Sequence, residues 1–98
     1  MGFEVFLDKR VHSEIEKGIE DLVSKNFNAA KKFYLQIQET YSALAKNPYY
    51  QIRYKMIRCI PIKGFPYMFH FSLNEKSNCV QIHALIHTSM NPEKSWLK

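Results

Sequence analysis

The spacing of apolar residues changes abruptly near the middle of this 98-residue chain, at Asn47-Pro48. Before that dipeptide, apolar residues recur at steps of three and four, which is the period of one face of an α-helix. After it, they recur at every second residue, which is the period of a β-strand. Proline lacks the backbone donor that would continue a helix, and its ring disfavours helical geometry in the preceding residue. The first half of the chain is therefore expected to be mainly helical and the second half to form a sheet.

Two amphipathic helices are predicted in the first half, after a short strand at residues 3–7. The first helix carries one apolar stripe, formed by Ile15, Ile19, Leu22 and Val23. It begins either after an N-cap Asp8 or at a capping box of Ser13 and Glu16. Residues 26–28 interrupt the pattern, and the second helix carries the stripe Ala30, Phe33, Ile37, Tyr41 and Leu44. Neither stripe can be buried by the other helix alone, so a sheet is expected to cover this helical hairpin.

Three strands are predicted in the second half, over residues 52–63, 67–73 and 79–88. Short turns between them imply an antiparallel meander, with residues 3–7 joining its edge. The apolar faces of the last two strands are predicted to be Tyr67, Phe69, Phe71 and Leu73, and Val80, Ile82, Ala84 and Ile86. The predicted fold class is therefore α+β, a single domain over residues 1–98 with one mostly antiparallel sheet packed on the helical hairpin.

The formal charge of +5 belongs entirely to the second half of the chain. Residues 1–47 contain seven Lys and Arg against seven Asp and Glu, whereas residues 48–98 contain seven against two. Four of these cations lie in one predicted strand, namely Arg53, Lys55, Arg58 and Lys63. Such asymmetry is typical of a surface that meets nucleic acid, an acidic protein segment or an anionic membrane. The alternative is that the charges guard an exposed sheet edge against aggregation.

The sequence contains neither a long apolar run nor an apolar segment behind a basic N-terminus, so a cytoplasmic location without a membrane partner is expected. Cys59 and Cys79 lack metal-binding spacing and are expected to be reduced thiols. His83 and His87 would stand about 13 Å apart along one strand, too far to share a zinc ion. Neither a metal nor a cofactor is predicted.

Histidines give the predicted sheet a possible chemistry. With the alternation above, the face away from the helices carries Met68, His70, His83 and His87. Histidine transfers protons near neutral pH, and adjacent cations stabilise phosphate charge, so such a face could support cleavage of RNA. The alternative is that these histidines are only polar surface residues.

The order of motifs resembles the RelE/ParE superfamily of toxins from bacterial type II toxin-antitoxin systems. The resemblance covers nearly the whole chain and rests on a strand, a helical hairpin, and then Asn47-Pro48, Arg58, Phe65-Pro66-Tyr67, His87, Asn91-Pro92 and Trp96. It implies a toxin that a cognate acidic antitoxin neutralises. RelE-like members cleave messenger RNA on the ribosome, whereas ParE-like members share the fold and poison DNA gyrase.

One departure from the family pattern favours the ParE-like alternative. The family commonly has Arg three residues after the histidine, but this chain has Met90 there. If such a cation acts like other single electrostatic donors, its loss slows RNA cleavage by a factor of about 10² to 10³. The predicted function is gyrase inhibition, and the alternatives are a ribosome-dependent endoribonuclease or an inactive binding module. The nuclease alternative would use His87, Arg58, Lys55 and His83 as catalytic residues, while the predicted partner-binding residues are Arg53, Lys55, Lys63, Met90 and Trp96.

Overall fold

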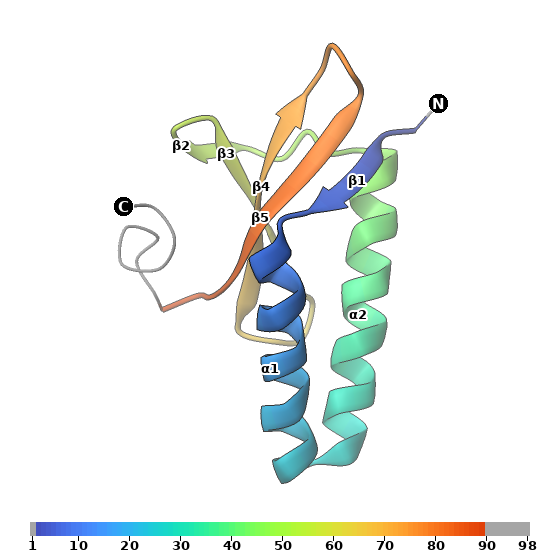
Figure 1. Cartoon of the computed structure of the whole chain (residues 1–98), viewed down its shortest axis with the longest axis vertical. Helices are drawn as coiled ribbons and strands as arrows, with labels where there is room; N and C mark the ends of the chain where they lie inside the picture. Colours follow the sequence, from blue (N-terminus) through green and yellow to red (C-terminus); the bar gives the residue numbers. More distant parts are fainter. Residues whose placement is uncertain (1, 90–98) are drawn as a thin grey trace.

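The computed structural model describes residues 2–89, which form two helices and one sheet (Figure 1). In chain order its elements are β1 (Glu4–Leu7), α1 (Lys9–Lys25), α2 (Phe27–Lys46), β2 (Ile52–Tyr54), β3 (Ile57–Pro61), β4 (Tyr67–Asn74) and β5 (Cys79–His87). The sheet order is β1-β5-β4-β3-β2, with β1 parallel to β5 and the other neighbours antiparallel. This confirms the predicted α+β class and the mostly antiparallel sheet with the first strand at its edge.

Each helix begins directly after its N-cap position, Asp8 for α1 and Asn26 for α2. Asp8 precedes α1 in an extended conformation, whereas Ser13 lies inside that helix, so the first of the two predicted starts is confirmed. The Asn26 side chain accepts a hydrogen bond from the Ala29 backbone N–H at 3.2 Å and thereby caps α2. Helix α2 ends just before Asn47-Pro48, as expected. Within the described residues, neither helix is both long and apolar enough to cross a membrane.

The prediction of one strand over residues 52–63 is wrong, because the chain reverses at Lys55-Met56 and forms the hairpin of β2 and β3. The two turn residues have positive φ, 41° for Lys55 and 66° for Met56. Tyr54 pairs with Ile57 across them, which is the arrangement of a two-residue type I′ hairpin. Asn-Gly or Asp-Gly usually makes this turn, so Lys-Met gives no sequence signal for it.

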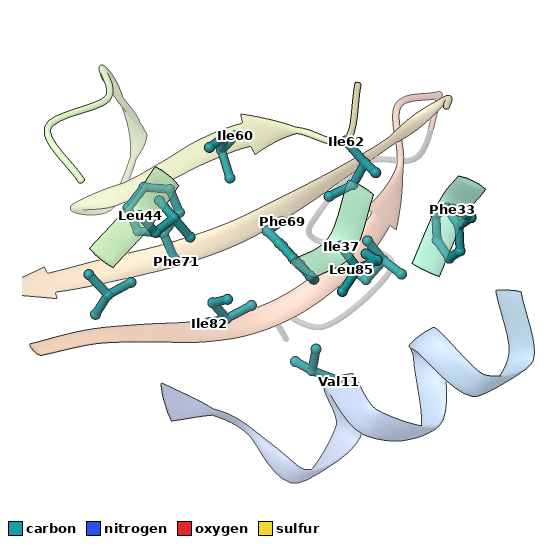
Figure 2. Close-up of a cluster of buried hydrophobic side chains, with 11 residues drawn as sticks. Val11, Phe33, Ile37, Leu44, Ile60, Ile62, Phe69, Phe71, Ile82 and Leu85 are labelled. Atoms are coloured by element: carbon teal, nitrogen blue, oxygen red, sulfur yellow. The ribbon is translucent and has the colours of Figure 1, made fainter. Parts of the chain in front are cut away.

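The core lies between the helical hairpin and one face of the sheet (Figure 2). Phe69 and Phe71 of β4 are fully buried there and Tyr67 packs against the same cluster, as predicted, and Phe65 also packs against it. Tyr41 of α2 stacks on Phe69 with a ring-centroid distance of 5.7 Å. Aromatic side chains from β4 therefore help to hold the sheet on the helices.

A bulge in β5 overturns part of the alternation predicted for that strand. His70 and Phe71 pair with Ala84 and Ile82, so His83 is an extra residue in β5. An extra residue shifts the alternation of side chains beyond it by one position. Leu85 consequently pairs with Phe69 and belongs to the core. Ala84 and Ile86 are buried on the opposite face of the sheet. The predicted placement of Ala84 on the helix-facing side is therefore wrong, and so is that of residue 86.

Candidate functional site

Polar side chains gather on the sheet face that lies away from α1 and α2, which we call the far face. Paired residues of neighbouring strands share a face. Cys59 pairs with His70, and Ser72 pairs with Gln81, on the side opposite to the Phe69 core. The far face therefore carries two of the three histidines predicted there, His70 and His83, but in very different surroundings.

Asp8, His83 and Ser72 form a hydrogen-bonded relay on the far face. The His83 Nδ1 atom lies 3.0 Å from Asp8 Oδ2, and its Nε2 atom lies 2.8 Å from Ser72 Oγ. An ionised carboxylate only accepts hydrogen bonds, so Nδ1 donates to Asp8, and in the neutral imidazole Nε2 accepts from the Ser72 hydroxyl. Gln81 Nε2 donates to Asp8 Oδ1 at 2.6 Å. The side chains of His83 and Asp8 are 22% and 31% exposed, so solvent reaches the relay.

His70 is buried, which corrects the prediction that it is exposed. Its Nδ1 atom lies 2.6 Å from the Tyr54 hydroxyl oxygen and 3.6 Å from Cys59 Sγ. Burial, assisted by the nearby positive charge of Arg53, lowers the pKa of His70 to about 4, and burial raises the pKa of the Cys59 thiol. Both groups are uncharged near neutral pH. His70 therefore anchors the β2–β3 hairpin to the sheet instead of exchanging protons.

His87 faces α1, so its predicted place on the far face is also wrong. It pairs with Tyr67, and the two rings meet edge to face with centroids 5.5 Å apart. Both residues line a cleft of about 290 Å³ with Glu14 and Lys17 of α1. His87 Nδ1 lies 2.8 Å from Ser89 Oγ. The bulge in β5 is the reason, because it reverses the direction of every side chain beyond it.

Glu14 protects the edge of β5 beyond the end of β1. Its Oε1 atom accepts a hydrogen bond from the Leu85 backbone N–H at 2.9 Å, on a part of β5 that β1 does not pair. Burial raises the pKa of the Glu14 carboxyl, although the Leu85 hydrogen bond and the Arg10 charge oppose that shift. The side chain thus supplies a partner to a backbone donor that the sheet leaves free.

The cations of the predicted basic strand do not form one surface. Arg58 Nη1 donates to the Tyr50 backbone oxygen at 2.7 Å, so this arginine holds the chain that enters β2. Arg53 and Lys55 are exposed in the hairpin of β2 and β3, whereas Lys63 is exposed beyond the other end of β3. The turn at Lys55-Met56, which the sequence did not reveal, separates them.

Two predicted partner-binding residues, Met90 and Trp96, lie outside the described residues. Within residues 2–89, no three His, Cys, Asp or Glu side chains are grouped so that they could hold a metal ion. Cys59 is buried and Cys79 is half-buried, and both are free thiols.

An apolar groove on the helical hairpin is a second candidate site, which the sequence analysis missed. This hairpin groove has a volume of about 290 Å³ and is lined by Ile19, Val23, Phe27, Ala30, Lys31, Tyr34 and Leu35. Four of its apolar side chains are 46 to 64% exposed, namely Val23, Phe27, Tyr34 and Leu35. The last three stand at i, i+7 and i+8 on α2, a second apolar stripe that could have revealed the groove.

The described architecture matches that of a solved toxin-antitoxin structure. The chain aligns with a chain of the "Chromosomal ParDE TA system from P. aeruginosa" with a TM-score of 0.75 and 12% sequence identity. The alignment covers 87% of this chain and 95% of that chain. No protein-family model matches the sequence, and no curated protein matches it. At this identity the likeness shows that the two chains share a fold, and function has to be argued from the sites.

Proposed function

We propose that this chain is the toxin component of a type II toxin-antitoxin system, that it inhibits DNA gyrase by binding it, and that an acidic antitoxin neutralises it. The fold shared with a chain of the ParDE system supports the toxin role. The motif order of the sequence supports the same role independently of the fold. The choice of gyrase over messenger RNA depends on the arrangement of the candidate catalytic residues.

The scattering of those residues is the observation that carries the proposal. Ribonucleolysis needs a base, an acid and a cation around one phosphate. His83 lies on the far face, whereas His87 lies in the cleft beside α1. Arg58 is bound to a backbone oxygen, and Lys55 lies at the tip of a hairpin. These positions favour a protein that acts by binding over one that cleaves RNA.

Parallel assays of the two targets test the proposal. The purified chain is expected to inhibit the supercoiling activity of gyrase in vitro and to leave messenger RNA intact when expressed in cells. Cleavage of messages in phase with codons, lost in His87→Ala while supercoiling is unaffected, would establish the RelE-like nuclease instead. A folded chain that is silent in both assays would be an inactive binding module.

The hairpin groove is the surface that we assign to the antitoxin. An amphipathic helix binds by placing its apolar face in an apolar groove. The groove exposes Phe27 and Leu35, and Lys31 stands beside Phe27 with its Nζ atom 5.9 Å from the ring centroid. A helix with an apolar face flanked by acidic residues complements this surface. The docking surface expected from the sequence was the basic strand, and the separation of its cations argues against it.

Calorimetric titration with the protein of the neighbouring reading frame compares the two surfaces. Phe27→Asp is expected to weaken binding by at least about 30-fold, because it removes the most exposed apolar side chain of the groove. Met56→Asp is the matched control, because Met56 is 70% exposed and lies away from the groove. Unchanged affinity in Phe27→Asp, with weaker and less salt-dependent binding when Lys55 and Lys63 are changed to Glu, would move the docking site to the predicted basic strand.

A further inference from the structure

The relay on the far face has the connectivity of a nucleophile, a base and an orienting carboxylate. Such a set is identified by its geometry and roles, whatever the fold and the order of residues. Ser72 Oγ lies 2.8 Å from His83 Nε2, and Asp8 Oδ2 lies 3.0 Å from Nδ1 of the same ring. We propose that Ser72 is a nucleophilic serine activated by His83, and that it accepts acyl or phosphonyl groups from reactive esters. This activity goes beyond the proposed toxin function and does not depend on it.

The hydrogen bonds of the Asp8 carboxylate show that the relay is more than a chance contact between polar residues. Asp8 is the N-cap of α1, but its side chain makes no capping hydrogen bond. Such a bond contributes about 1 kcal/mol to a helix. Both carboxylate oxygens are directed to β5 instead, where one accepts from Gln81 and the other faces His83. Asp8 and Gln81 are therefore positioning residues that fix the tautomer and orientation of His83.

The bulge in β5 provides the remaining alignment. His83 is the extra residue, inserted between Ile82, which pairs with Phe71, and Ala84, which pairs with His70. Ser72 stands next to Phe71 on β4, so the displaced imidazole reaches the serine of the neighbouring strand on the far face. Bulges frequently redirect a side chain in this way next to functional sites.

The proposed reaction needs no reactant other than the ester and water. The Ser72 hydroxyl proton moves to His83 Nε2 while Oγ forms a bond to the electrophilic carbon or phosphorus. The bond to the leaving group breaks, and the proton on Nε2 passes to the group that leaves, an ester oxygen or, in a fluorophosphonate, fluoride. For a carboxylic ester, water then gives a proton to Nε2 and attacks the acyl carbon, and Ser72 leaves with that proton. Asp8 stays ionised throughout and stabilises the imidazolium.

The class of substrate follows from what the relay supplies. Its described hydrogen bonds supply a base, and a donor to the developing oxyanion would contribute a further factor of about 10² to 10³ in rate. Esters with good leaving groups depend least on that contribution. Ser72 is half-buried and His83 is 22% exposed, so the group transferred must be small.

A fluorophosphonate probe with site-resolved mass spectrometry tests the proposal on the full chain. Ser72 is expected to be labelled at least tenfold faster than Ser77, an exposed serine of the turn before β5 that serves as an internal control. Ser72→Ala should abolish the adduct, and Ser77→Ala should leave it unchanged. His83→Gln should slow labelling at least tenfold. Asp8→Asn should slow it and alter its pH dependence, which a purely structural role of Asp8 would not do.

A second variant covers the case in which changes at His83 or Asp8 unfold the chain. In Ser72→Cys the introduced thiol would lie beside His83, and a thiolate paired with imidazolium reacts with iodoacetamide even in mildly acidic solution. Cys79 in the same molecule is the reference. If Ser72 is labelled no faster than Ser77, and the introduced thiol reacts no faster than Cys79 below neutral pH, the relay is only a structural clasp and the proposal is wrong.

Discussion

Replacing the strained turn between β2 and β3 should stabilise the protein. Lys55 and Met56 both adopt positive φ, a region that L-residues other than Asn and Asp rarely occupy. Glycine occupies it readily, and Asn tolerates it, which is why Asn-Gly is the preferred pair in type I′ turns. The double change Lys55→Asn and Met56→Gly therefore relieves backbone strain without altering the path of the chain.

The expected gain is about 1 kcal/mol in the free energy of unfolding. The left-handed conformation costs an ordinary residue about 1 to 2 kcal/mol. Glycine at position 56 removes that strain but loses about 0.5 to 1 kcal/mol through the greater freedom of the unfolded chain, and Asn at position 55 removes part of the remainder. Little packing is lost, because Met56 is 70% exposed and Lys55 is also exposed. For a domain of this size, 1 kcal/mol raises the melting temperature by about 4 to 8 °C.

Thermal and urea denaturation followed by circular dichroism measure the effect. Met56→Ala is the matched control, since it removes the exposed side chain, keeps the strain, and should give no comparable gain. Gly64→Ala should lower the melting temperature, because Gly64 has φ +85°, which alanine rarely adopts. A Cβ added at this position would meet no atom within 4 Å, so the change adds only backbone strain. A double variant that melts at or below the temperature of the parent would refute the assignment of strain to this turn.

Three further changes test the core, a cap and the buried histidine. Phe69→Ala should lower the free energy of unfolding by about 3 to 5 kcal/mol, measured by urea denaturation, because Phe69 is fully buried and stacks on Tyr41; a shift of only a degree or two in melting temperature would contradict its place in the core. Asn26→Ala should lower it by about 1 kcal/mol through loss of the hydrogen bond to Ala29, and Asn28→Ala is the neighbouring control. Folding lowers the pKa of His70 from 6.5 to about 4, so between these pH values only the unfolded state binds a proton at this residue. The free energy of unfolding should therefore decline as the pH falls from 6.5 to 4. In His70→Gln that part of the pH dependence should be absent from urea melts between pH 4 and 7.

The sequence alone predicted the types of element and the class of the fold. The period of Phe33, Ile37 and Leu44 predicted a helix, and the alternation of Phe69 and Phe71 predicted a strand with its core face. These patterns are local, because the spacing of apolar residues reports which faces of one element can be buried together. Asn47-Pro48 marked the boundary between the two halves for an equally local reason, the geometry of proline.

The candidate site was decided by tertiary structure. Lys55 and Met56 are not typical residues of such a turn, so the sequence gives no local signal for it. The turn forms because the pairing of β2 with β3 outweighs the preference of these residues for negative φ. One extra residue, His83, reversed the directions of Leu85 and His87, which no count of alternating positions could have revealed. The relay joins Asp8 and His83 across 75 positions of the chain. Apolar period is a property of neighbours in sequence, whereas register, bulges and hydrogen bonds between distant side chains arise only when separate strands are packed against one another.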